Sequence, residues 1–177
     1  ALGALQVATV DGPFANDLLG YTYDQLGRVT NRTVNGAANS ATWAYDGLGR
    51  LTSELNVLGT FGYTYVGATT RLATASYPNG QATTFAYLPN LQDRRLQTIR
   101  HIYPNQATLS QFDYTYDAVG NIRGWRQQAD STATQWSYDY DAADQLTQAV
   151  QQSADTPPVL LKRYAYGYDP AGNRTRE

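Results

Sequence analysis

The chain of 177 residues contains no cysteine and no methionine, and it has a single histidine. Without cysteine there is no disulfide framework, and one histidine leaves almost no soft metal ligands. No apolar run approaches the roughly 20 residues of a membrane-spanning helix, so membrane insertion is not expected. These absences predict a protein without a metal site, without a cofactor and without disulfide cross-links.

Charge of either sign is also scarce. The net charge is −2, and Lys162 is the one lysine among thirteen basic residues. Such a weak field would not attract nucleic acid, so we expect no nucleic-acid partner. What the chain has instead is fifteen tyrosines and many arginines. Tyrosine rings can pack while their hydroxyls find partners, and the flat guanidinium of arginine stacks on such rings.

The tyrosines recur in a pattern. The stretch Tyr21–Thr30 (YTYDQLGRVT) returns almost unchanged as Trp43–Thr52 (WAYDGLGRLT), and five looser copies follow. The second aromatic of each copy falls at positions 23, 45, 65, 87, 116, 140 and 168, which gives a period of a little over twenty residues. A period in this range indicates a repeat protein.

Each copy is expected to form a β-hairpin. Aromatics two residues apart lie on one face of a strand, because strand side chains alternate. Asp24 suits the first position of a type I turn, and Gly27 suits the left-handed position that closes a three-residue loop with a bulge. The register then places Tyr23 opposite Val29 and Thr22 opposite Thr30.

The turn residues form the predicted structural motif. The copies contribute Asp24, Gly27 and Arg28; Asp46, Gly49 and Arg50; Asp117 and Gly120; Asp141 and Asp144; and Asp169 and Gly172. Asp144 stands where the other copies have glycine, and aspartate tolerates the left-handed backbone. Because a catalyst needs one perturbed site, the repetition of the same aspartate favours turn closure, and we expect no catalytic residue. Residues 139–144 lack the glycine and the distant glutamate of a calcium-binding loop, so a calcium site there is the less favoured interpretation. His101 has no cysteine and no Ser/Asp motif around it, which favours a structural role.

The whole chain, residues 1–177, is therefore expected to be one all-β domain of about seven hairpins. We predict an antiparallel meander of about 14 strands that coils into a spiralling sheet, because strand twist accumulates across wide sheets. Asn-Gly turns at 34–36 and 77–80 would close the opposite ends of the hairpins. Residues 91–96 are expected to form a loop or a short helical turn, and 149–158 a hairpin tip. The first and last strands would be open edges, which invite self-association.

The repeated motif resembles that of the RHS/YD-repeat family, whose signature is an aromatic, any residue, Tyr-Asp, two residues, Gly-Arg, an aliphatic and Thr. Tyr21–Thr30 and Trp43–Thr52 match it fully, and the resemblance covers residues 15 to 177. It implies a β-sheet strip that spirals into a hollow shell. Such shells enclose a toxic C-terminal segment in bacterial members, and teneurins display a similar barrel on the cell surface. The family's self-cleaving region is not among these residues, so we expect a piece of a longer chain without protease activity.

This resemblance implies a structural, non-enzymatic section of a shell that encloses or presents another polypeptide, secreted or at the cell surface. The alternative is a module that binds carbohydrate or a cell surface through exposed rings. Its candidate stacking residues are Trp43, Trp125 and Trp136, because indole and phenol rings can stack on flat ligands. Rings at core-type register are more often packed in the protein. A hydrolase is the third and least favoured class, because no pair of carboxylates stands out in the sequence.

Overall fold

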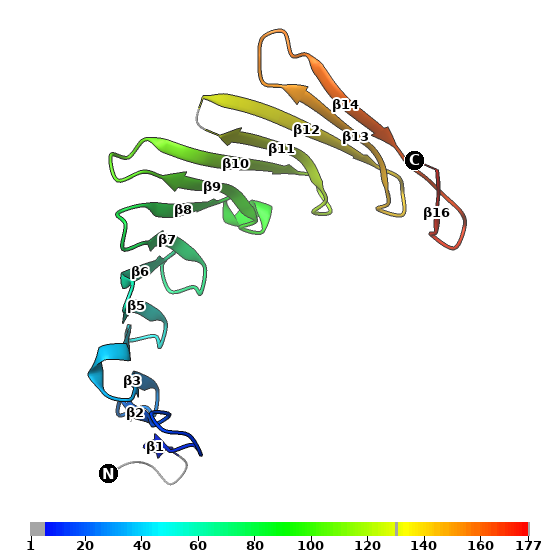
Figure 1. Ribbon diagram of the computed structural model, residues 1–177. Coiled ribbons are helices and arrows are strands. Elements are labelled where there is room, and N and C mark those ends of the chain that lie inside the picture. The colour runs from blue at the N-terminus through cyan, green and yellow to red at the C-terminus, as the bar shows by residue number, and fades with distance from the viewer. Residues whose placement is uncertain (1–5, 130, 177) are drawn as a thin grey trace. The chain divides into compact units, whose positions relative to one another are not determined.

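The computed structural model describes residues 6–129 and 131–176, and the chain within them is almost entirely β (Figure 1). The helical segments of these residues are two three-residue 3-10 turns, η1 (Ala37–Asn39) and η2 (Asn90–Gln92). The chain divides into two compact units, Ala1–Ala82 and Thr83–Glu177, which are described separately. A single domain over all 177 residues stays a prediction.

The first unit is built of short antiparallel strands, each paired with the next one along the chain. Its strands are β1 (Thr9–Val10), β2 (Leu19–Tyr23), β3 (Val29–Val34), β4 (Ala41–Tyr45), β5 (Leu51–Asn56), β6 (Gly59–Tyr65) and β7 (Leu72–Ser76). The first strand, β1, contains only two residues.

The second unit contains longer hairpins, which lie side by side in Figure 1. Its strands are β8 (Ala82–Tyr87), β9 (Leu96–Ile102), β10 (Thr108–Tyr116), β11 (Ile122–Ala129), β12 (Thr132–Tyr140), β13 (Leu146–Ser153), β14 (Leu160–Ala165), β15 (Gly167–Tyr168) and β16 (Arg174–Arg176). The hydrogen-bonded order of β1 to β14 is their order in the chain, whereas β15 and β16 form a separate two-stranded sheet. The predicted all-β antiparallel meander is confirmed; its coiling stays a prediction.

The hairpin register agrees with the prediction at the turn and departs from it one residue later. Tyr23 is opposite Val29 as expected, but Thr22 is opposite Asn31 because the register shifts between Thr22 and Tyr23. The side chains of Thr22 and Thr30 still meet, with 3.1 Å between their hydroxyl oxygens. The bulge therefore lies within the strand pair, and the predicted facing of Thr22 and Thr30 is corrected by one residue.

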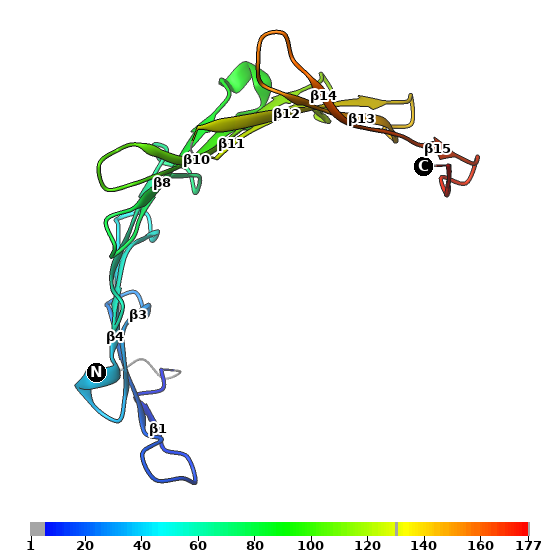
Figure 2. The same cartoon turned by 45° about the horizontal axis from the view of Figure 1, so that its top comes forward.

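Each unit is a single layer of sheet, with no second layer over either face of the described residues (Figure 2). The buried hydrophobic side chains are few and mostly small: Ala41, Ala75, Ile102 and Ala149. Ala149 shows why small residues are buried, since it is only 4% exposed and is opposite Tyr138 on one neighbouring strand and Tyr164 on the other. The two tyrosine rings cover the alanine between them. Side chains therefore pack against neighbours on the same face of the sheet, and not against a second layer.

Two loop predictions are settled by the strand bounds. Residues 149–153 were expected in a hairpin tip, but they form the end of β13, because β12 and β14 pair with it from both sides. The tip is therefore shorter than predicted. The segment 91–96 combines both expected forms, since η2 lies within a loop that ends where β9 begins at Leu96.

Candidate functional site: the row of acidic turns

The acidic turn of the first full copy is closed from both of its ends. Asp24 Oδ1 accepts hydrogen bonds from the N–H groups of Leu26 and Arg28 at 2.9 and 3.0 Å, and Oδ2 accepts from Arg28 Nε at 2.6 Å. The backbone N–H of Asp24 donates to the Arg28 carbonyl at 2.9 Å. Gly27 has φ 80°, the left-handed conformation that glycine adopts without strain. Both carboxylate oxygens are thus used within the turn.

The second full copy repeats this geometry. Asp46 Oδ1 accepts from the N–H groups of Leu48 and Arg50, both at 2.9 Å, and Arg50 Nε donates to Oδ2 at 2.7 Å. These bonds, chiefly from the Arg50 guanidinium and N–H, hold the pKa of Asp46 below its ordinary value. In the first copy the bonds from the Arg28 N–H and guanidinium lower the pKa of Asp24 in the same way. Both carboxylates are ionised hydrogen-bond acceptors and poor proton donors near neutral pH.

Three further copies keep the aspartate but replace the arginine. Asn121 and Asn173 donate from Nδ2 to Asp117 and Asp169 at 3.2 and 3.0 Å, so a neutral amide substitutes for the guanidinium. Among the described residues Asp141 accepts from backbone N–H groups alone, those of Ala143 and Gln145. The left-handed positions of these turns are Gly120 (φ 112°), Asp144 (φ 59°) and Gly172 (φ 83°). All five predicted aspartates therefore lie in turns, where each accepts hydrogen bonds from its own turn.

Arginine also connects one turn to the next copy. The Arg28 guanidinium carbon lies 4.5 Å from the ring centroid of Tyr45, and Arg50 lies at the same distance from Tyr65. A guanidinium over an aromatic face is attracted by the ring quadrupole. The side chain that closes one turn thus also covers the second aromatic of the following copy.

The second aromatic in turn bonds back to the copy before it. Tyr45 donates its hydroxyl to the Val29 carbonyl at 3.0 Å, and Tyr65 donates to the Leu51 carbonyl at 2.7 Å. The same contact recurs from Tyr23 to Val7, Tyr116 to Leu96, Tyr140 to Ile122 and Tyr168 to Leu146, at 2.6–2.9 Å. Desolvation by burial raises the pKa of the Tyr116 and Tyr140 hydroxyls. We call this set of contacts the turn column. It consists of the bond from the turn aspartate to its arginine, the stacking of that arginine on the tyrosine of the next copy, and the bond from that tyrosine back to a strand carbonyl.

The closing side chain of a turn also reaches the backbone of the next turn. Arg50 Nη1 donates to the carbonyls of Gly67 and Thr69 at 2.7 and 2.5 Å. In the second unit Asn121 Nδ2 donates to Asp144 Oδ1 of the next turn at 2.8 Å. These contacts fix the positions of successive turns. They also engage the Arg50 guanidinium and the Asn121 amide, which could otherwise donate hydrogen bonds to a ligand.

Sequence reasoning missed two members of the turn column. The degenerate copies lack the aspartate, but Val66 and Leu88 take its backbone role: their N–H groups donate to the carbonyls of Arg71 and Arg95 at 2.9 and 2.8 Å. Arg95 lies 5.6 Å from the Tyr116 ring centroid, as the arginines of the full copies lie over their tyrosines. The signal was present in the Arg-Leu pairs at 71–72 and 95–96, which match Arg50 and Leu51.

The three predicted stacking residues are divided between the two units. Trp43 belongs to the first unit, where it lines an open depression of about 410 Å³ with Tyr21 and Tyr45. Trp125 and Trp136 lie opposite each other on β11 and β12 of the second unit. Trp125 lines a depression of about 310 Å³, and Trp136 packs parallel to Tyr138.

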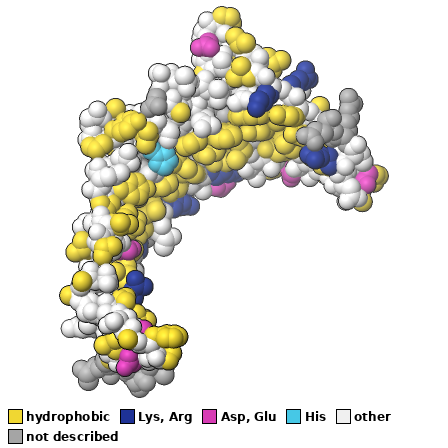
Figure 3. Space-filling model, viewed as in Figure 1, with side chains coloured by type: hydrophobic (Ala, Val, Ile, Leu, Met, Phe, Trp, Pro, Cys, Tyr) yellow, Lys and Arg dark blue, Asp and Glu magenta, His cyan; other side chains and the backbone are white. Residues whose placement is uncertain are grey.

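All three tryptophans are partly buried by neighbouring side chains. In the second unit hydrophobic side chains form a band across the strands (Figure 3). A ligand-stacking role for these tryptophans stays a prediction.

Two other titratable groups, Asp139 and His101, have structural partners. Asp139, the first residue of the candidate calcium loop 139–144, forms an ion pair with Arg123 at 2.8 Å. His101 Nδ1 lies 2.8 Å from the Thr83 hydroxyl, and its ring contacts Phe112 edge-on. Across residues 6–129 and 131–176 there is no group of three His, Asp or Glu side chains placed to hold a metal ion. In the same residues no helix has the length and hydrophobicity needed to cross a membrane.

Comparison with known proteins gives similarity at the level of the fold. Neither a protein-family model nor a curated protein sequence matches the chain. The solved structure of TcdB2-TccC3-Cdc42 aligns with a TM-score of 0.69 and 23% identity, covering 91% of this chain and 9% of that one. TcdB2-TccC3-TEV aligns with a TM-score of 0.67 and 24% identity over 98% of this chain and 10% of that one.

The strand order and the turn column define the class: an open antiparallel repeat sheet in which each hairpin is bonded to the next. More particularly, the chain has the fold of a section of the TcdB2-TccC3 chains. It spans about a tenth of their length. This fold is the one that the resemblance to the RHS/YD-repeat family predicts.

Proposed function

We propose that this chain is a structural, non-enzymatic section of a YD-repeat shell, secreted or at the cell surface, which encloses or presents another polypeptide. The observation that carries the proposal is the turn column, which recurs in both units with the same bond from tyrosine hydroxyl to strand carbonyl. The fold similarity to TcdB2-TccC3 supports it. A column of this kind can hold the strands in register over any number of repeats, as the wall of a shell requires.

The hydrogen bonding of the turn aspartates also favours a structural role over a catalytic one. The aspartates that recur most prominently accept two or more hydrogen bonds within their own turns, as Asp24 and Asp169 do. A general acid or a nucleophile needs a group that is free to reach a substrate. These carboxylates are instead fixed as acceptors, which suits a scaffold.

A single layer with partly exposed faces suits contact with another polypeptide. Large hydrophobic side chains on the turns are exposed, such as Leu26 at 76% and Val119 at 73%. Interaction surfaces commonly combine exposed aliphatic groups with half-buried aromatic rings. The enclosed or presented chain would bury part of this surface.

Limited proteolysis tests the proposal. The chain is expressed with the sequence that flanks it in its gene, and it is digested in native buffer and in urea. A shell wall protects a neighbouring segment of the same protein in native buffer and loses this protection when urea unfolds the sheet. Equal cleavage of every flanking segment under both conditions would show that nothing is enclosed.

The alternative, binding through exposed rings, draws on the open depression at Trp43, where Arg32 also lies 5.9 Å from the indole ring centroid. Binding of a glycan that is lost in Trp43→Ala and Trp125→Ala, with unchanged thermal unfolding, would favour that function over the shell.

A further inference from the structure

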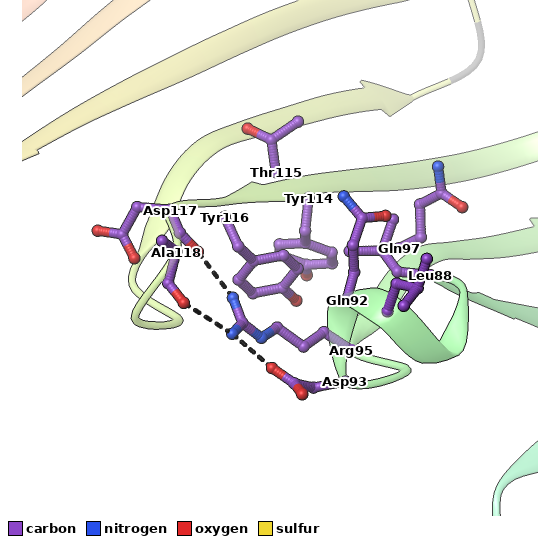
Figure 4. Close-up of a pocket in the computed structure, with 11 residues that line it drawn as sticks. Leu88, Gln92, Asp93, Arg95, Gln97, Tyr114, Thr115, Tyr116, Asp117 and Ala118 are labelled. Atoms are coloured by element: carbon purple, nitrogen blue, oxygen red, sulfur yellow. Dashed lines mark hydrogen bonds and ion pairs between the residues drawn. The ribbon is translucent and has the colours of Figure 1, made fainter.

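We propose that the loop between β8 and β9 forms a binding pocket for a neutral saccharide. The proposal does not rest on the shell function. The pocket has a volume of about 450 Å³, within the roughly 300–1,000 Å³ typical of small-molecule sites. It is bounded on one side by residues 88–97, which comprise this loop and the start of β9, and on the other side by residues 114–118 of the next hairpin (Figure 4).

The pocket exists because this copy departs from the repeat. In the full copies three residues separate the two ends of the turn, as between Asp24 and Arg28. Here the equivalent ends are Leu88 and Arg95, and the longer connection folds back through η2. Asp93 and Arg94 both have positive φ, at 58° and 50°, which turns the chain back toward Arg95. The extra residues form a wall that the other turns lack.

The charged groups of the pocket are already engaged. Arg95 Nη1 donates to the Asp117 carbonyl at 2.8 Å, and its Nη2 donates to Asp93 Oδ2 at 2.8 Å and to the Ala118 carbonyl at 3.3 Å. The Asp117 carboxylate accepts from the N–H groups of Gly120 and Asn121. No cation is left to hold a phosphate, and the one exposed carboxylate is paired with arginine. The chemistry of the pocket therefore favours a neutral ligand.

Neutral hydrogen-bonding groups remain unused. The side-chain amides of Gln92 and Gln97 and the Tyr114 hydroxyl line the pocket, and none has a side-chain partner among the described residues. Each amide offers donors and an acceptor, and the phenol offers one donor and one acceptor. Adjacent hydroxyls of a sugar need this mixture of donors and acceptors. The Tyr114 and Tyr116 rings, side by side in Figure 4, supply an apolar surface for its C–H groups.

The test uses the 177-residue chain and a panel of probes: the methyl glycosides of glucose, galactose, mannose and N-acetylglucosamine, followed by neutral oligosaccharides on an array. We expect at least one to bind with a Kd of about 1 mM or tighter. Gln92→Ala with Gln97→Ala should weaken that binding at least tenfold. Thermal unfolding should not change, because neither amide forms a side-chain hydrogen bond among the described residues.

Two further variants keep the result unambiguous. Tyr114→Phe retains the ring and removes the hydroxyl, so it should weaken binding without affecting the fold. Gln25→Ala, an exposed residue in a regular turn, is the matched control and should bind as the original chain does. Absence of binding to every probe would overturn the proposal. Binding that survives the double glutamine variant but is lost in Trp125→Ala would place the ligand on the ring-bearing strands and would also overturn it.

Discussion

Arg50 lies 4.5 Å from the ring centroid of Tyr65, and Tyr65 belongs to the copy that follows the turn that Arg50 closes. Arg50 is also bonded to Asp46 in its own turn and to two carbonyls of the next turn. One side chain thus contacts its own turn, the next ring and the next turn.

Replacing Arg50 by lysine keeps the charge but removes the planar guanidinium that makes these contacts at once. We expect the free energy of unfolding to fall by about 1–3 kcal/mol, from lost hydrogen bonds and lost stacking. Urea unfolding followed by tyrosine and tryptophan fluorescence measures the change. Arg123→Lys is the control, because its ion pair with Asp139 is more exposed and should contribute less than about 1 kcal/mol. Equal losses in both variants would show that Arg50 has no special role.

Removing the Tyr65 hydroxyl tests the bond from ring to strand. Tyr65→Phe leaves the Leu51 carbonyl without its donor, so we expect a loss of about 1 kcal/mol in the free energy of unfolding. Tyr114→Phe serves as the comparison, since the Tyr114 hydroxyl has no partner among the described residues. Urea midpoints measured side by side should fall for Tyr65→Phe and stay unchanged for Tyr114→Phe. The opposite order would contradict the turn column.

The two glycines of one turn should respond differently to alanine. Gly49 has φ 81°, and a Cβ there would lie 3.5 Å from Arg28 Nη1, whereas Gly47 has no such φ and open space around it. Gly49→Ala should cost about 1–2 kcal/mol, because an L-residue is strained in the left-handed region. Gly47→Ala should be neutral or slightly stabilising. Thermal unfolding distinguishes them, and equal melting temperatures would refute the assignment of strain to Gly49.

Acid should weaken the fold through the turns. Asp24, Asp46 and Asp169 have lowered pKa values in the folded chain because hydrogen bonds stabilise their charged forms. For Asp117 partial desolvation raises the pKa, but bonds from the Gly120 and Asn121 N–H groups outweigh it, and the net shift is downward.

A group with a depressed folded pKa stabilises the fold above its unfolded pKa of about 3.9, and this stability is lost as the pH falls through the folded value. Melting temperatures measured from pH 7 to pH 2.5 should therefore drop below about pH 4. Asp24→Asn with Asp46→Asn should flatten the drop. An unchanged pH profile in the double variant would contradict this linkage.

The local parts of this structure could be predicted from the sequence because they depend on neighbours in the chain. The Asp-to-Gly spacing and the ring alternation predict the hairpin, and the meander follows from the repetition. The contacts between copies could not be predicted in the same way. Tyr45 bonds to a carbonyl 16 residues earlier, and this partner is known only once the strand order is known.

Composition misled in one place and hid a signal in another. Residues 149–153 are rich in glutamine and serine, which is typical of loops, but pairing on both sides makes them part of β13. Arg71 and Arg95 close turns without an aspartate, so a search for the acidic residue passes over them. The pocket beside Arg95 could not be predicted for a different reason: it arises from an extra length of chain in one copy and has no sequence motif of its own.

The turn column has a consequence for how such a protein can change in evolution. The turn column connects each hairpin to its neighbours along the chain. Duplication or loss of one whole hairpin therefore leaves the contacts among the other hairpins intact. The long connection from Leu88 to Arg95 shows that the turn of a hairpin can also be lengthened, provided that its arginine still covers the ring of the following copy. The number of hairpins and the length of individual turns can therefore change independently of each other.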